Sequence, residues 1–125
     1  MREVSRRIIL GACVALACGS VAAAHHSNAM YEESKTVTLR GVVTELRWTN
    51  PHVTMTVKTD AGRVDGAVWI LETTSPGNLS RVGWTRTSVK NNDRVEVLVS
   101  PLRDGQHGGR CRMLTLLDTK RVLEC

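Results

Sequence analysis

Alternation of apolar and polar residues is clearest in two stretches of the chain, residues 53–58 and 95–99. In each stretch every second residue is valine or methionine, and the residues between them are mostly polar. This period of two is typical of a strand with one buried face, because successive side chains of a strand point to opposite sides. Both stretches are therefore predicted to be half-buried strands.

The other apolar segments predict three more strands, over Val37–Trp48, Val64–Leu71 and Arg112–Leu117. Residues 122–123 either extend the last strand or pack as a tail. In the first segment the buried parity changes at Gly41, and such a change at a glycine is typical of a bulge or sharp bend. A long, bent first strand can pair with both halves of a sheet, as a small closed barrel requires.

Two breaks in the alternation separate these strands. Trp48-Thr49-Asn50-Pro51-His52 joins the first two strands, and Asn50-Pro51 is a turn signal. Ser75 can cap a helix, Pro76 suits its first position and Gly83 can end it, which predicts one short helix after the third strand. Residues 104–109 are rich in glycine and are expected to form a loop.

The resulting order is strand, strand, strand, short helix, strand, strand. This order is that of an OB-fold, a five-stranded barrel with its helix between strands three and four. An open β-sandwich is the competing interpretation, and the helix position together with the bent first strand favours the barrel. Trp48, Trp69 and Trp84 are expected to supply much of the core, because the chain has no phenylalanine and a single tyrosine.

The first 24 residues have the layout of a secretory signal peptide: a basic start, an apolar run and an exit of small residues. The run is too short for a spanning helix, which argues against a membrane anchor. We expect a signal peptide over 1–24, an extended arm over 25–36 and the barrel over 37–125. Ser5-Arg6-Arg7 matches a twin-arginine leader only in part, so the general secretory route is favoured. The expected location is the periplasm, with no membrane contact after cleavage.

The formal net charge of the chain does not change the expected fold or location. The leader holds three arginines and one glutamate, so its removal lowers the formal charge from +5 to +3. The remaining basic and acidic residues are interspersed, which is typical of a solvated surface and not of a nucleic-acid face.

Two cysteines remain after the leader, Cys111 and Cys125. In an oxidising compartment they are expected to form a disulfide. Closing a loop of about 15 residues would stabilise the fold by roughly 3 kcal/mol in the chain-entropy model. A bond between two molecules is the alternative.

The histidines are the main candidates for chemistry. Cleavage before His25 would expose an amine and an imidazole that together chelate Cu²⁺, and cleavage one residue earlier would place His26 in the third position of a copper-chelating end. Amine and imidazole nitrogens favour copper. His52, fixed after Asn50-Pro51, is the natural additional ligand. The alternative is that His52 bonds within its own turn and that His25 and His26 belong to a plain polar arm.

No set of catalytic residues stands out. The serines have no histidine nearby in sequence, and no glycine-rich phosphate loop precedes a helix. We therefore expect a binding or accessory protein, not an enzyme, with a periplasmic protein or small ligand as its partner. Periplasmic copper binding is the alternative function, and a hydrolase assembled by folding is the weakest.

The chain also resembles a family of small exported bacterial proteins of unknown function. The resemblance rests on His25-His26-Ser27, on the W-x-N-P-H motif of residues 48–52, on Trp69 with Ser75-Pro76 and Gly83-Trp84, and on Pro101–Gly105. It implies an exported, OB-like domain and carries no established activity, cofactor or catalytic residue. The cysteine pair is not associated with the family pattern.

Overall fold

The computed structural model describes residues 28–60 and 66–125. Six strands and one helix occur in this part of the chain: β1 (Val37–Arg47), β2 (Thr54–Thr59), β3 (Val68–Glu72), α1 (Pro76–Arg81), β4 (Arg94–Pro101), β5 (Gly108–Leu116) and β6 (Val122–Glu124). Their order confirms the predicted arrangement, with a short sixth strand added at the end. None of the helices in the described ranges is long and apolar enough to cross a membrane.

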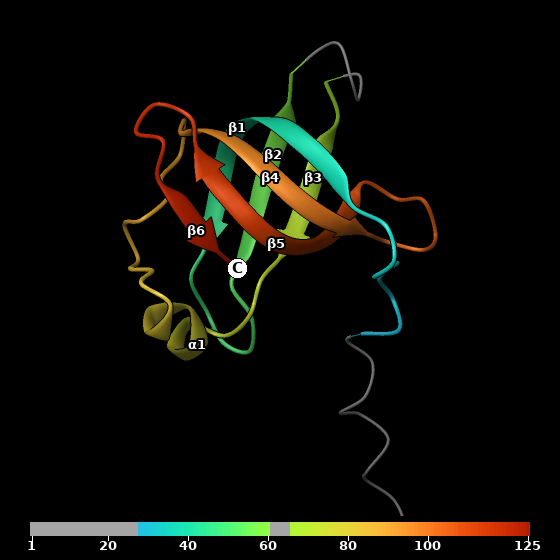
Figure 1. The fold of residues 1–125 in the computed structure, drawn as a ribbon, viewed down its shortest axis with the longest axis horizontal. Coiled ribbons are helices and arrows are strands. Elements are labelled where there is room, and N and C mark those ends of the chain that lie inside the picture. The colour runs from blue at the N-terminus through green and yellow to red at the C-terminus, as the bar shows by residue number, and fades with distance from the viewer. Residues whose placement is uncertain (1–27, 61–65) are drawn as a thin grey trace, which may run out of the picture.

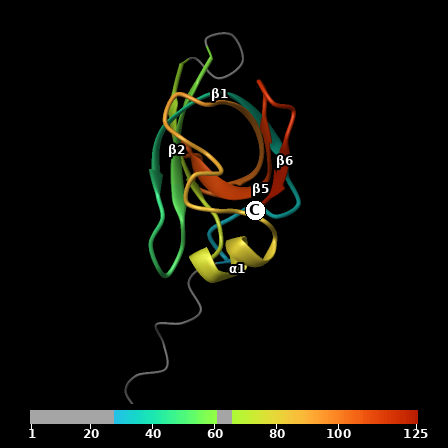
Figure 2. The same ribbon diagram turned by 90° about the vertical axis from the view of Figure 1, so that its left-hand side faces the viewer.

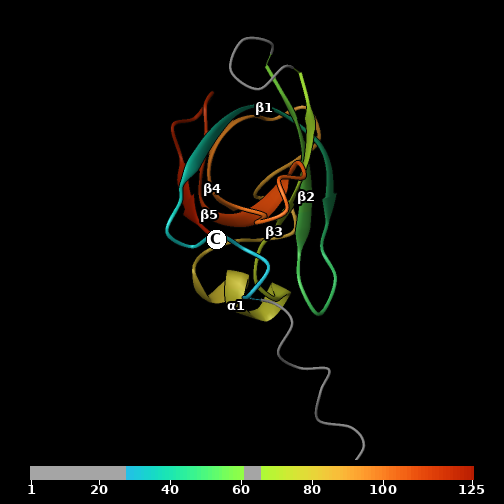
Figure 3. The same ribbon diagram turned by 90° about the vertical axis from the view of Figure 1, so that its right-hand side faces the viewer.

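The strands close into a barrel. They are arranged in the order β3-β2-β1-β4-β5-β6, and a further parallel pairing of β3 with β5 closes β1 to β5 into a ring, with β6 paired outside it to β5. Figures 2 and 3, which look along the barrel, show the strands as a ring with α1 below it. This geometry confirms the predicted OB-like barrel, in which α1 lies between the third and fourth strands.

β1 connects the two halves of the barrel, as the bent first strand was expected to do. It pairs with β4 through Val37–Val42 and with β2 through Gly41–Arg47. The curve of β1 across the top of the barrel is visible in Figure 1. A side chain at Gly41 would collide with the carbonyl of Lys58, so glycine is required at this close approach of β1 and β2.

The bulge in β1 is not at Gly41, where the sequence placed the change of parity. The register shift occurs between Val43 and Glu45, and Leu39, Gly41 and Val43 all face inward. The prediction was wrong by about two residues because Val42, although apolar, points outward and is only half-buried. Gly41 permits close packing, and the bulge after Val43 changes which face is buried.

The start of β5 also differs from the prediction. Gly108 and Gly109 were expected in a loop, but both are buried residues of the strand. A Cβ at Gly109 would lie 2.5 Å from the carbonyl oxygen of Ser100, and one at Gly108 would lie 3.3 Å from the carbonyl of Ile70. The two glycines therefore allow β5 to pass between β3 and β4 and to close the barrel.

The core fills the inside of this ring. Trp84 is 2 % exposed, and its indole Nε1 donates a 2.7 Å hydrogen bond to the carbonyl of Glu124 in β6. Ser75 caps α1 by accepting from the amide of Asn78, and Leu79 of the helix is fully buried. Among the side chains with almost no exposed surface, the largest besides Trp84 are those of Leu39, Met55, Leu71, Leu79 and Leu114.

Candidate functional site

A polar recess of about 140 Å³ lies beside the seam where β3 meets β5. Its walls come from the N-terminal arm (residues 28–36), the loop before β2, the end of β3 and the start of β5. The lining residues are Asn28, Tyr31, His52, Glu72, Thr73, Thr74 and Arg110.

Glu72 is the central residue of the recess. The register of the sheet places it between Thr54 of β2 and Arg110 of β5. One carboxylate oxygen accepts a 2.7 Å hydrogen bond from the hydroxyl of Tyr31, and the other contacts Nδ1 of His52. A single carboxylate thus holds side chains from the arm and from the loop before β2.

The backbone beside the recess fixes the position of His52. The peptide bond between Asn50 and Pro51 is cis, and the chain then enters the core at Val53, which is fully buried. Val53 donates to the carbonyl of Thr74, and both the amide and the hydroxyl of Thr73 donate to the carbonyl of Val53. The His52 side chain remains 37 % exposed at the mouth of the recess.

Contact with the carboxylate also determines which nitrogen of His52 faces outward. A carboxylate accepts hydrogen bonds and does not donate them, so Nδ1 of His52 carries the proton in its bond to Glu72. In the neutral ring the other nitrogen, Nε2, then has a free lone pair. His52 therefore offers Nε2 as an acceptor or metal ligand.

Tyr31 reaches the recess because the arm is attached to the barrel. Tyr31 forms an isolated bridge with Leu102, and the amide of Glu32 donates to the carbonyl of Pro101 at 2.8 Å. Tyr31 is 4 % exposed. Burial, and then the hydrogen bond to Glu72, raise the pKa of Tyr31 above its ordinary value.

Charged side chains hold the same arm at the rim. Arg110 donates to the side-chain oxygen of Asn28 at 3.1 Å and to Glu33 at 3.3 Å, while Arg103 pairs with Glu32 at 2.9 Å. The rim pair of Arg110 and Glu33 is about half exposed, so it adds little stability and mainly orients the arm. The arm is thereby fixed across the β3–β5 seam.

Of the histidines predicted to bind metal, the structure places His52 in the recess, while His25 and His26 lie outside the described residues. Asn28, which lines the recess, follows His26 by two positions. Within the described ranges, no three side chains of histidine, cysteine, aspartate or glutamate are close enough to hold a metal ion.

The predicted structural residues lie away from this recess or at its edge. Trp48 is half-buried and packs against the core, and Trp69 is buried beneath His107, with ring centroids 5.3 Å apart. Nε1 of Trp69 is buried and has no hydrogen-bond partner among the described residues. Cys111 and Cys125 form the predicted disulfide within one chain.

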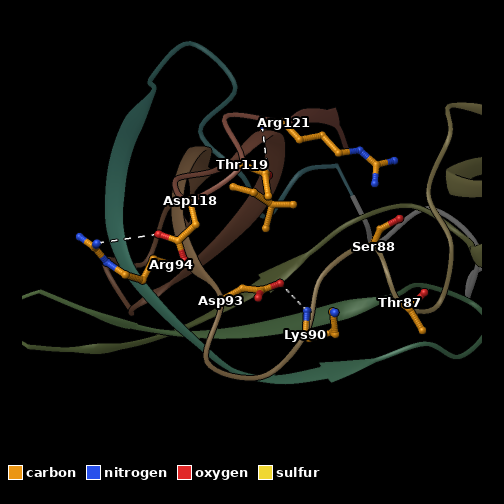
Figure 4. A pocket seen from close by; sticks show the side chains of 9 residues that line it. Thr87, Ser88, Lys90, Asp93, Arg94, Asp118, Thr119 and Arg121 are labelled. Atoms are coloured by element: carbon orange, nitrogen blue, oxygen red, sulfur yellow. Dashed lines mark hydrogen bonds and ion pairs between the residues drawn. The ribbon is translucent and has the colours of Figure 1, made fainter.

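A second hollow, of about 290 Å³, lies between the loop before β4 and the turn from β5 to β6. Figure 4 shows one ion pair along its walls, Arg94 with Asp118, and the carboxylate of Asp93 accepting a hydrogen bond from the backbone amide of Lys90. Its lining mixes three basic side chains, Lys90, Arg94 and Arg121, with the two carboxylates of Asp93 and Asp118, so this hollow has no strong preference for a charged ligand.

Sequence reasoning did not assign Tyr31, Glu72 or Arg110 to a site. Of the three, only Tyr31 could have been suspected from the sequence, because it is the sole tyrosine and stands in an otherwise polar arm. Glu72 directly follows an apolar stretch of the sequence. Nothing in the sequence shows that the backbone of Arg110 pairs beside it, because parallel pairing of strands 38 positions apart leaves no local pattern.

This chain belongs to a family described as "Family of unknown function (DUF6152)", whose model matches residues 13–111. The match covers most of the barrel and ends at Cys111, so Cys125 lies beyond it. No curated protein and no solved structure gives a significant match.

Proposed function

We propose that this protein is an exported, non-catalytic binding module of the periplasm, which holds a small ligand or a segment of a partner protein at the recess. The observation that carries the proposal is that Glu72 binds Tyr31 and His52 from separate parts of the chain, in a recess that Arg110 also lines. Binding sites use a small number of precisely placed polar groups to orient a ligand, and this recess gathers such groups.

The outer face of β2 and β3 supports the same proposal. Beyond Glu72, this face presents Ile70 and Val68, which are 61 % and 54 % exposed, opposite Thr56 and Lys58 of β2. In OB-folds the face of strands two and three, with the adjoining loops, is the usual place for ligands. The recess is therefore the polar end of an outer face that also offers apolar contacts.

The proposal is tested by a screen for ligand-induced stabilisation. A ligand present at 100 times its Kd stabilises the folded state by about 2.7 kcal/mol, which raises the Tm of a domain of this size by roughly 10–20 °C. Compounds found in the screen are then tested against Arg110→Ala and Ile70→Ser.

Val122→Ser is the matched control, because Val122 of β6 is exposed to a similar extent, 55 %, on a different strand. We expect Arg110→Ala or Ile70→Ser to abolish the stabilisation and Val122→Ser to preserve it. Equal shifts in all variants, or no stabilising compound together with no partner retained from periplasmic extract, would contradict the proposal.

Copper binding in the periplasm is the second candidate function. We infer that Cu²⁺ would be held by the N-terminal amine with His25 or His26 and by Nε2 of His52. The supporting observation is that Asn28 and His52 line the same recess. Asn28 follows His26 by two positions in the sequence, and two residues of chain span at most about 7 Å.

The test starts from natively processed protein whose first residue has been identified by intact mass. Cu²⁺ is titrated into this protein, into a form with several residues added before His25, and into His52→Ala. We expect both changes to weaken binding, whereas His107→Ala does not, because His107 stacks on Trp69 away from the recess residues. Equally weak binding in every form would rule out this function.

A further inference from the structure

We propose that the recess takes the backbone of an extended peptide segment from a partner protein, with an apolar side chain of that segment lying against Ile70. This inference rests on the proposed binding function and narrows its ligand to a peptide amide. The observation that carries it is the contrast between the polar groups of the recess that the protein already pairs and those that it leaves open.

The carboxylate of Glu72 is already in use. Oε2 accepts from the hydroxyl of Tyr31 at 2.7 Å, and Oε1 contacts Nδ1 of His52. Among the described residues that line the recess, Glu72 is the one acidic side chain. The recess therefore offers no open carboxylate to a ligand that binds through an ammonium or guanidinium group.

An acceptor and a donor group stay open on either side of Glu72. Nδ1 of His52 faces the carboxylate, so Nε2 of the neutral ring keeps its lone pair for an N–H. Arg110 uses Nη1 for its bonds to Asn28 and Glu33, which leaves Nε and Nη2 without a partner among the described residues. The recess thus presents an acceptor from the loop before β2 and donors from β5.

These two open groups are complementary to a peptide unit. In an extended chain the N–H and C=O of one residue point to the same side, as in the hydrogen-bonded pairs of an antiparallel sheet. The N–H then donates to Nε2 of His52, and the C=O accepts from Arg110. Neither side chain loses its water without gaining a partner, which keeps the cost of desolvation low.

The charges of the recess favour a neutral amide over a carboxylate. Arg110 is paired with Glu33 at 3.3 Å, and His52 lies against Glu72. Each of these basic side chains already has an acidic neighbour, so a ligand carboxylate gains little attraction and is repelled by Glu72. An amide avoids this repulsion and keeps both hydrogen bonds.

Apolar side chains continue the recess along the seam. Ile70, two positions before Glu72, points to the same outer face and is 61 % exposed. Gly108 of β5 lies opposite Ile70, and Leu102 covers it, because a Cβ at Gly108 would lie 2.7 Å from Cδ1 of Leu102. A segment whose backbone is held in the recess can therefore place an apolar side chain against Ile70 and Leu102.

The proposal is tested by NMR titration of the natively processed protein with N-acetyl-leucine methylamide, in mildly alkaline buffer. Two matched analogues each replace one of the N–H groups of this probe by an ester oxygen. We expect the amide probe to shift the backbone resonances of Glu72, Thr73 and Arg110. At least one ester should bind roughly 2- to 10-fold more weakly, because it lacks the N–H that His52 accepts.

Variants assign each contact to a residue. In His52→Ala the preference for the amide over that ester should vanish. In Ile70→Ser the preference should persist, while the amide and the ester both bind more weakly. Val122→Ser is the matched control for Ile70→Ser, because Val122 is 55 % exposed on a different strand, and it should leave both affinities unchanged. N-acetyl-leucine, which ends in a carboxylate, should bind more weakly than the amide probe.

Failure of this proposal and failure of the binding function give different results. Equal binding of the amide and both esters, a preference that persists in folded His52→Ala, or tighter binding of the carboxylate would overturn the peptide proposal. If the amide probe does not bind but a compound from the stabilisation screen requires Arg110 or Ile70, the peptide proposal is wrong and the binding function stands. If neither binds, both are wrong.

Discussion

The phenol of Tyr31 and the carboxylate of Glu72 are joined by a hydrogen bond of 2.7 Å, although 41 positions separate them in the chain. Tyr31 belongs to the arm, and Glu72 ends β3 at the β3–β5 seam. The bond therefore ties the first described segment of the chain to the line along which the barrel closes. It also makes the ionisation of Tyr31 a direct measure of whether the arm is docked.

Tyr31 should resist ionisation in alkaline solution. Burial and Glu72 raise its pKa in the folded state above the ordinary value of 10.0. The resulting contribution to stability is complete below pH 10 and is lost as the pH rises above it, because the unfolded state then releases a proton that the folded state retains. Since Tyr31 is the sole tyrosine, tyrosinate absorbance reports on it alone. We expect that absorbance to appear together with alkaline unfolding.

Glu72→Gln should shift the ionisation of Tyr31 back toward pH 10, because it removes the negative charge while keeping the size of the side chain. Glu96→Gln serves as the control, because Glu96 pairs with Arg40 on the outer face of β1 and β4 and does not line the recess. Tyrosinate absorbance at pH 10 in folded wild-type protein would show that the arm is not docked as described.

The arm should loosen in acid. The hydrogen bond from Ser34, followed by the charge of Arg103, lowers the pKa of Glu32 below 4.5. A depressed carboxyl pKa contributes stability that is present above the ordinary value and is lost as the pH falls through the folded value. The amide of Glu32, bonded to Pro101, reports this change. Its hydrogen-exchange protection should fall as the pH is lowered below 4.5, the ordinary pKa of a glutamate carboxyl, and it should fall at a higher pH in Ser34→Ala.

Gly109→Ala should destabilise the barrel. The added methyl group would lie 2.5 Å from the carbonyl oxygen of Ser100, and overpacking of this kind costs about 1–3 kcal/mol. Gly77→Ala is the matched control, since nothing lies within 4 Å of the corresponding position in α1. There alanine should be neutral or stabilising, by at most about 1 kcal/mol. Urea unfolding midpoints provide the measurement, and similar midpoints for the two variants would contradict the close approach of β5 and β4.

Removal of the disulfide should lower stability without changing the recess. The bond joins Cys111 of β5 to Cys125 across a separation of 14 positions, and a loop of that length is worth roughly 3 kcal/mol. The double variant Cys111→Ser, Cys125→Ser should therefore melt at a lower temperature. The tyrosinate titration of Tyr31 should be unchanged in the folded variant. An unchanged Tm would show that the bond does not constrain the unfolded chain.

The fold could be predicted because its strands follow local rules. Alternation with a period of two located β2 and β4, and the caps at Ser75 and Gly83 located α1. The bulge after Val43 was misplaced, because an apolar residue can face outward and the sequence does not show which side of β1 is buried. Gly108 and Gly109 were misassigned since glycine permits a loop and a close approach equally well, and the neighbouring strands decide between them.

The site could be predicted only in part. The sequence singled out His52 as a candidate because a histidine after Asn50-Pro51 has a defined position, and the structure places it at the recess. Glu72 and Arg110 meet through parallel pairing of β3 with β5, which depends on closure of the whole barrel. Tyr31 was expected in a polar arm, but the bridge to Leu102 brings it into contact with the barrel and buries it.

The position of Asn28 at the wall of the recess has a practical consequence for how the protein is prepared. A purification handle attached before Asn28 would put foreign residues near the recess, which His52 also lines. A polyhistidine handle there would itself bind copper and would imitate the activity under test. Recombinant material should therefore carry its handle after Cys125, or keep its own leader and be harvested after natural processing.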